Sequence, residues 1–191
     1  MAIFKIEPFF SQKIWGSNKL KDMGYKIKSN DIGEAWVASA HNNGMGYLKW
    51  KNKKISLQKF YSENSFFNNE YDEFPLLVKI ITASDFLSVQ VHPNDEYAKN
   101  RHNSLGKPES WYILDCPEDA YLIYGHNAKT KEDFVKAIES NDWNSVLKKV
   151  SIKKGDFLYV PPRKNSRYNS SSDLIRTTKI KWHNISIIWF W

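Results

Sequence analysis

The chain has 191 residues, of which 41% are hydrophobic and 15% aromatic, and this composition excludes a disordered chain. Its formal net charge is +7, but six of the basic residues and only one acid lie from Arg163 onward. The part before Arg163 is nearly neutral, which argues against a nucleic-acid binder. A single cysteine, Cys116, excludes an internal disulfide and a cysteine-based zinc site.

The N-terminal sequence, MAIFKIEPFF, is too short and too interrupted for the apolar region of a signal peptide. No segment approaches the ~20 apolar residues of a transmembrane helix. With one thiol and no targeting segment, we expect a cytoplasmic protein without a membrane partner.

Residues 1–60 contain short apolar runs broken by glycine, asparagine and serine, a pattern typical of short strands and turns. Leu76–Ile81 is predicted to be a buried strand. Asp85–His92 is predicted to be the next strand, with Ser88, Gln90 and His92 on one face. Pro93 would end it, because proline cannot donate to the ladder.

Two further strands are predicted at Trp111–Leu114 and Ala120–Tyr124. A helix is predicted after Thr130, which can cap it, with Glu132 and Asp133 in its first turn. A second short helix is predicted over Trp143–Lys149.

Phe157–Val160 is predicted to be another strand, because Gly155 and Asp156 supply a turn before it. Many short strands with one helical insert indicate a mainly β fold, a barrel or jelly roll with helices on one side.

A metal-binding pattern begins at Gln90 and His92, because side chains two residues apart on a strand point the same way. Glu109 stands at the start of a later predicted strand. An amide oxygen, an imidazole and a carboxylate form a mixed N/O donor set that suits zinc or another divalent first-row ion. Taken alone, such a polar pair is also explained by ordinary hydrogen bonds.

Longer sequence motifs accompany this metal-binding pattern. FPLLVKI, SVQVHP and GKPESWYIL follow one another in this order, after IWG at 14–16 and GEAWVASAH at 33–41. In these words, from residue 1 to about residue 162, the chain resembles the type I mannose-6-phosphate isomerases of the cupin superfamily.

The resemblance implies a cupin-type jelly-roll barrel over residues 1–162 with a helical insert at about 130–150. It also implies one zinc ion held by Gln90, His92, Glu109 and a second, downstream histidine. The implied reaction interconverts mannose 6-phosphate and fructose 6-phosphate, so a sugar phosphate is the expected partner. The oligomeric state stays open.

Aldose–ketose isomerisation moves a proton between C1 and C2 through an enediolate, and a Lewis acid stabilises its negative charge. Lys107 would contact the oxyanion or the phosphate if the strand of Glu109 extends that far, and otherwise it is a solvated loop lysine. Ser88 would contact sugar or phosphate, or bond its neighbours in the strand.

Other polar and aromatic residues receive structural interpretations. Trp111 is expected in the core, Glu34 and His41 in the framework of the early strands, and His102 and His126 in solvated loops.

The chain departs from the family at the second cupin word, G-x5-P-x-G-x2-H. Gly155 and Pro161 fit, but Arg163 stands in place of glycine and Ser166 in place of the fourth ligand, histidine. Residues 163–191 are therefore predicted to be an anomalous tail. Its end, Ile185–Trp191, is apolar, uncharged and prone to aggregation.

Two explanations of the tail remain, a divergent ending or a shifted reading frame. Residues 165–172 can be written AAT TCA CGC TAT AAT TCA TCA TCA, which one base later gives I-H-A-I-I-H-H, and the family has an I-H-A word here. This favours a frameshifted truncation, with residues 167–191 outside the native barrel. The activity of this chain is therefore open, and the alternative is a non-catalytic cupin that binds sugar phosphates.

Overall fold

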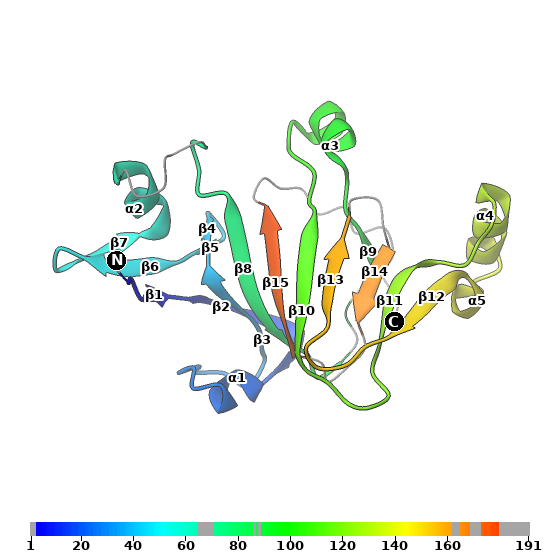
Figure 1. Ribbon diagram of the computed structural model, residues 1–191, viewed down its shortest axis with the longest axis horizontal. Helices are drawn as coiled ribbons and strands as arrows, with labels where there is room; N and C mark the ends of the chain where they lie inside the picture. Colours follow the sequence, from blue (N-terminus) through cyan, green and yellow to red (C-terminus); the bar gives the residue numbers. More distant parts are fainter. Residues whose placement is uncertain are drawn as a thin grey trace.

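A computed structural model describes residues 3–64, 71–85, 87 and 89–161, together with the backbone of residues 165–168 and 173–179. Strands dominate and form two main sheets, with order β13-β10-β15-β8-β3-β2 in one and β12-β11-β14-β9 in the other. Figure 1 shows the two sheets side by side in the body of the molecule, with the helices at its periphery. The prediction of a mainly β, cupin-type jelly-roll fold is confirmed.

The six-stranded sheet is antiparallel throughout. Its strands, in spatial order, are β13 (Phe157–Val160), β10 (Glu109–Asp115), β15 (Asp173–Lys179), β8 (Leu76–Thr82), β3 (Ile32–Ala38) and β2 (Phe9–Ser17). The four-stranded sheet consists of β12 (Leu147–Ser151), β11 (Tyr121–His126), β14 (Asn165–Tyr168) and β9 (Gln90–Val91). Small sheets of β1 (Ile6–Glu7), β6 (Tyr47–Trp50) and β7 (Lys53–Ser56), and of β4 (Ala40–His41) and β5 (Gly44–Met45), complete the described strands.

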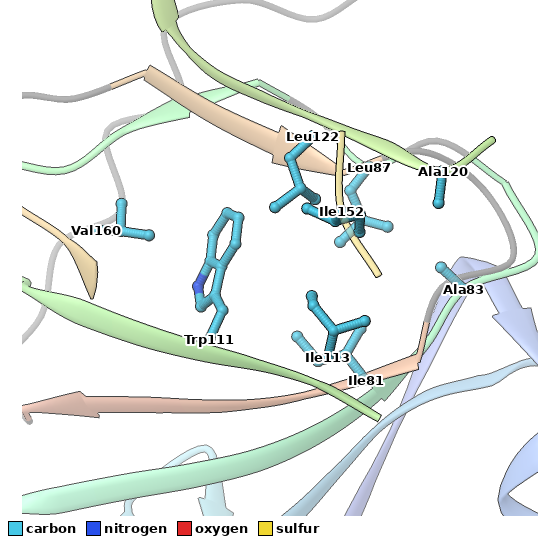
Figure 2. Packing of buried hydrophobic residues seen from close by; sticks show 9 residues of the cluster. All are labelled: Ile81, Ala83, Leu87, Trp111, Ile113, Ala120, Leu122, Ile152 and Val160. Carbon is cyan, nitrogen blue, oxygen red and sulfur yellow. The ribbon is translucent and has the colours of Figure 1, made fainter. Parts of the chain in front are cut away.

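A hydrophobic core fills the space between the two main sheets. Trp111 and Ile113 project from β10, Ile81 from β8, and Leu122 from β11 (Figure 2). Trp111 is only 2% exposed, which confirms the prediction that it belongs to the core. The alternation of buried and exposed residues along β10 follows from the two-residue period of a strand with one face inside the barrel.

Five helices flank the strands, and the sequence analysis predicted two of them. They are α1 (Lys19–Asp22), α2 (Leu57–Glu63), α3 (Asp95–His102), α4 (Lys131–Glu139) and α5 (Trp143–Val146) within the described residues. Helix α4 has the predicted cap, because Thr130 accepts from the Asp133 amide while Asp133 accepts from the Thr130 amide. His102 ends α3 rather than lying in a loop, and His126 ends β11.

The second predicted helix is too long. Helix α5 ends at Val146, and β12 begins at Leu147 and pairs with β11, with Leu122 opposite Val150. The insert is therefore helical only to Val146, because pairing with β11 satisfies the backbone of the next residues and overrides their helix propensity. Among the described residues of the predicted strand over Asp85–His92, Gln90–Val91 form strand β9.

The sequence predicts that residues 167–191 stay outside the barrel, but the backbone of residues 173–179 forms β15 inside the six-stranded sheet. Strand β15 lies between β8 and β10 and pairs with both, with Ile175 opposite Ile80 on one side and Tyr112 on the other. The facing edges of two buried strands need a partner for their N–H and C=O groups, and β15 supplies one with three β-branched residues, Ile175, Thr177 and Thr178. The apolar end, Ile185–Trp191, lies outside the described residues.

Candidate functional site

A glutamate lies on the inner face of the barrel at the start of β10. Glu109 is 1% exposed, and Trp111, two residues later, faces the same side and packs in the core. A carboxylate so deeply buried needs charged or hydrogen-bonding partners, because its transfer from water is costly.

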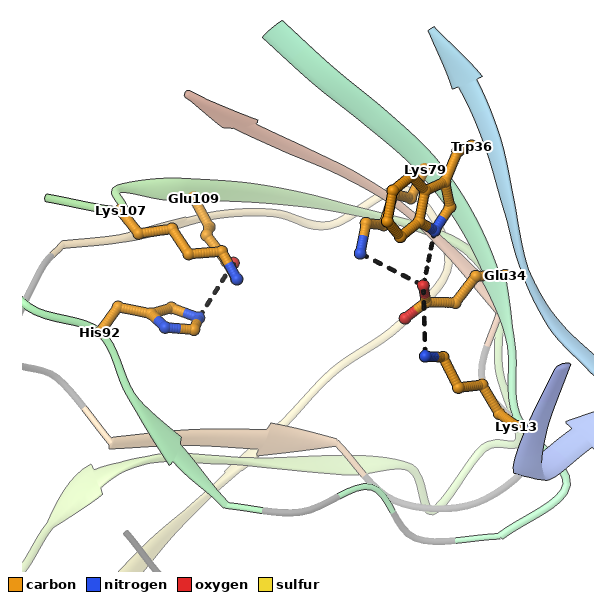
Figure 3. A network of polar contacts seen from close by, with 7 residues as sticks. All are labelled: Lys13, Glu34, Trp36, Lys79, His92, Lys107 and Glu109. Carbon is orange, nitrogen blue, oxygen red and sulfur yellow. Dashed lines mark hydrogen bonds and ion pairs between the residues drawn. The ribbon is translucent and has the colours of Figure 1, made fainter. Parts of the chain in front are cut away.

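Side chains of the described residues supply such partners on both carboxylate oxygens of Glu109. His92 Nε2 lies 2.9 Å from Oε1 and Lys107 Nζ lies 3.3 Å from the same oxygen. The Trp111 indole Nε1 donates to the other oxygen, Oε2, at 3.1 Å. Figure 3 shows His92, Lys107 and Glu109 pointing toward one another inside the barrel. His92 and Lys107 are buried too, so these contacts lie in a medium of low dielectric constant.

The loop before β10 is fixed against the end of β9, which brings Lys107 next to His92. The Lys107 amide donates to the Pro93 carbonyl at 3.1 Å, and the Gly106 amide donates to Asp95 Oδ1 at 2.7 Å. A Cβ on Gly106 would lie 2.7 Å from backbone atoms of Asn94 and Asp95. Only glycine permits this approach, so the local sequence Gly106-Lys107 is part of the site's construction.

The predicted site residues have different outcomes. His92, Lys107 and Glu109 come together, although β10 begins at Glu109 and Lys107 therefore reaches the carboxylate from the loop rather than from the strand. Gln90 is half-buried in β9 and is paired with Ser166 of β14. Ser88 lies outside the described residues.

Within the described part of the chain, no group of three or more His, Cys, Asp and Glu side chains could hold a metal ion. His92 and Glu109 supply one imidazole and one carboxylate, and an amide oxygen from Gln90 is the third donor that the sequence predicts. This donor set suits zinc in type, since zinc binds nitrogen and oxygen ligands at about 2.0–2.2 Å.

A second buried glutamate, Glu34 of β3, lies in the same barrel. Trp36 Nε1 donates to its Oε2 at 2.6 Å, and Lys79 Nζ of β8 lies 3.2 Å from that oxygen. Lys13 of β2 approaches it at 4.0 Å. The Lys79 ammonium also lies 4.3 Å from the centre of the Trp36 ring. Figure 3 shows this cluster beside the one around Glu109.

Lys79 is a site residue that was not predicted from the sequence. A signal was present, because a lysine inside the apolar run PLLVKII of a buried strand requires a partner of opposite charge. Lys79 occupies the same row of the sheet as Trp111, since each is paired with position 176 of β15. The two glutamate clusters therefore share one face of the six-stranded sheet.

The pKa of His41 is influenced by charges from both clusters. Its ring lies 5.8 Å from that of Trp36, and its Nδ1 accepts from the Asn43 amide at 3.1 Å. Burial lowers the pKa of His41, and the positive charges of Lys79 and Lys107 lower it further against an opposite effect of Glu73. His41 lies in β4, in the framework of the early strands as expected, and its pKa responds to charges from both clusters.

The chain as a whole was compared with known proteins. The family model of the type I phosphomannose isomerase catalytic domain matches residues 3–117. A mannose-6-phosphate isomerase of Bacillus subtilis is 47% identical over 159 residues, covering 81% of this chain and 50% of the relative. A mannose-6-phosphate isomerase of Streptococcus mutans is 46% identical and is covered to 52%. The chain thus spans about half the length of the curated relatives it matches.

Solved structures agree in fold. The mannose 6-phosphate isomerase from Bacillus subtilis superposes with a TM-score of 0.88 at 38% identity, covering 94% of this chain and 59% of that chain. A phosphomannose isomerase from Salmonella typhimurium superposes with a TM-score of 0.72 at 15% identity, which supports the fold alone. None of the described helices is long and apolar enough to cross a membrane.

Proposed function

Because the chain belongs to the type I phosphomannose isomerase family, we propose that it acts in the interconversion of mannose 6-phosphate and fructose 6-phosphate. The observation that supports this most is the buried cluster in which His92 and Lys107 both face Glu109 Oε1. The activity is a proposal for this chain, since its matched relatives are about twice as long.

Gln90, His92 and Glu109 are the residues that would hold a zinc ion. His92 Nε2 and Glu109 Oε1 are already 2.9 Å apart, so both atoms are within reach of one ion at ordinary ligand distances of about 2.0–2.2 Å. The Lewis-acid chemistry that zinc supplies when bound is stabilisation of negative charge on neighbouring sugar oxygens.

Lys107 is the proposed catalytic residue. Its ammonium is buried and directed at the same carboxylate oxygen as His92, so it can stabilise an oxyanion or the substrate's phosphate next to that carboxylate. Ser88 is the proposed second contact to the sugar phosphate.

A second candidate function is sugar-phosphate binding without catalysis. The observation that favours it is the pairing of Ser166 with Gln90. A histidine at this position would be the neighbour of Gln90 across the strands, whereas serine supplies no imidazole. The chain would then have three donors, which favours weaker metal retention.

A direct aldose–ketose assay with added zinc separates the two functions. Turnover that a chelator abolishes and that Glu109→Gln removes supports the isomerase. Mannose 6-phosphate binding without turnover, seen by calorimetry, supports the binding protein. Lys107→Gln should weaken binding or turnover, whereas Lys54→Gln, which changes an exposed lysine paired with Glu7, should not. A wild-type chain that neither binds mannose 6-phosphate nor turns it over would contradict both functions.

A further inference from the structure

The two buried glutamates share one local sequence pattern, Glu-x-Trp, at Glu34-Ala35-Trp36 and Glu109-Ser110-Trp111. Residues two apart on a strand face the same side, and in both cases the indole N–H donates to the glutamate, at 2.6 Å for Trp36 and 3.1 Å for Trp111. The indole is a donor only, so in each pair the carboxyl oxygen of the glutamate is the acceptor.

The contacts are distributed differently at the two glutamates. At Glu34 the contacts from Trp36, Lys79 and Lys13 all meet at Oε2. At Glu109 the indole takes Oε2, and His92 and Lys107 face Oε1. The terminal torsion of a glutamate has a broad energy minimum, so a donor on one oxygen decides where the other one points.

We propose that Trp111 is a positioning residue for the metal centre: its indole N–H holds Glu109 Oε2 and thereby directs Oε1 at the space that it shares with His92. The inference rests on the proposed zinc function of Glu109. Trp111 is also well placed for this task mechanically, because its ring is locked in the core with Ile81, Ile113 and Leu122 (Figure 2). Groups that hydrogen-bond to metal ligands tune metal affinity, and their loss costs about 10–100-fold in binding.

The test is zinc affinity measured by competition with a chromophoric chelator. Trp111→Phe keeps an aromatic ring in the core and removes the N–H, so zinc should bind about 10–100-fold more weakly. Trp36→Phe is the matched control, because it removes the same type of hydrogen bond from Glu34, and its zinc affinity should equal that of the wild type.

The outcomes separate the inference from the proposed function. Zinc binding in the wild type with the same affinity in Trp111→Phe overturns the positioning role and leaves the metal site intact. Equal weakening in Trp111→Phe and Trp36→Phe overturns it as well, because the effect would then be general to the fold. Absence of zinc binding in the wild type overturns the metal site itself, and the positioning role with it.

A second measurement serves if Trp111→Phe does not fold. In the wild-type chain, zinc titration followed by NMR should shift the assigned indole N–H signal of Trp111 and leave that of Trp36 in place. A Trp111 signal that does not respond to saturating zinc would overturn the proposal.

Discussion

The clusters around Glu34 and Glu109 are built from the same Glu-x-Trp pattern on the same sheet face, but their remaining partners differ. Glu34 faces two lysines, Lys79 and Lys13, whose positive charges offset its own. Glu109 faces one lysine and the imidazole of His92, which is a ligand for metals when neutral. The tryptophan fixes the carboxylate in both places, and the side chains brought by other strands and loops decide whether it stabilises the fold or offers a binding site.

The largest effect on folding is expected from a truncation that removes β15, the strand that links the two clusters. Strand β15 joins them, because it pairs with β8 beside Glu34 and with β10 beside Glu109. A chain ending at residue 162 should therefore fail to fold cooperatively, since β8 and β10 lose a common partner. Circular dichroism during heating measures this.

Removal of residues 182–191 alone is the matched control. It should preserve the fold and raise the soluble yield, because the apolar end is lost and β15 is kept. A cooperative transition in the chain of 162 residues would instead show that the predicted domain boundary is correct.

Substitution of Glu34 should cost stability without touching the metal site. Glu34→Gln removes the carboxylate charge that lies 3.2 Å from the Lys79 ammonium, whose side chain is 7% exposed, and breaking a buried pair costs about 3–5 kcal/mol. Urea unfolding measures the difference. Glu7→Gln breaks the exposed pair with Lys54 and should cost at most about 1 kcal/mol. Equal losses in the two variants would refute the structural role of Glu34.

The position opposite Gln90 should be able to strengthen the metal site. Ser166→His with Arg163→Gly places an imidazole at the register position paired with Gln90 and should increase zinc retention measurably, because the site gains a nitrogen donor. Asn165→His in the same Arg163→Gly background is the control, since position 165 is paired with Val91 and successive strand residues alternate in face. Equal zinc content in both variants would count against this register.

The smallest effect concerns pH. The pKa of His41 is lowered in the folded chain, so the unfolded chain takes up the proton first as the pH falls. The contribution of a neutral His41 to stability is present above the usual value of about 6.5 and is lost below it. The urea midpoint of the wild type, measured relative to that of His41→Asn at the same pH, should be lower at pH 5 than at pH 7. Identical pH dependence in the two proteins would rule out this contribution.

The sequence predicted those features that depend on local pattern. A continuous apolar run located β8, a short apolar segment located β10, the turn at Gly155 and Asp156 located β13, and Thr130 located α4. Helix α3 was missed although Asn94 caps it by accepting from the Tyr97 amide, because the residues that follow have little apolar periodicity.

Features that depend on pairing between distant segments could not be predicted in the same way. Leu147 starts a strand because β11 lies beside it, and the place of β15 is set by two strands far away in the chain.

The candidate site shows the same division. Proximity of His92, Lys107 and Glu109 followed from the family words, whereas the Lys79 contact to Glu34 joins residues on different strands. The hydrogen bond from Trp111 to Glu109 could have been found, because the Glu-x-Trp spacing places both side chains on one face.

Resequencing the gene across codons 155–191 tests the predicted frameshift, and an unshifted frame there would favour a divergent ending.

The central claim is that Glu109 is a metal ligand and Glu34 is not, and zinc-dependent stability tests it most directly. Zinc at 100 times its Kd should raise the unfolding free energy of the wild type by about 2.7 kcal/mol. Folded Glu34→Gln, isolated by gel filtration, should gain the same amount from its lower starting value, and Glu109→Gln should gain little at that zinc concentration. An equal gain in Glu109→Gln and the wild type would contradict the account.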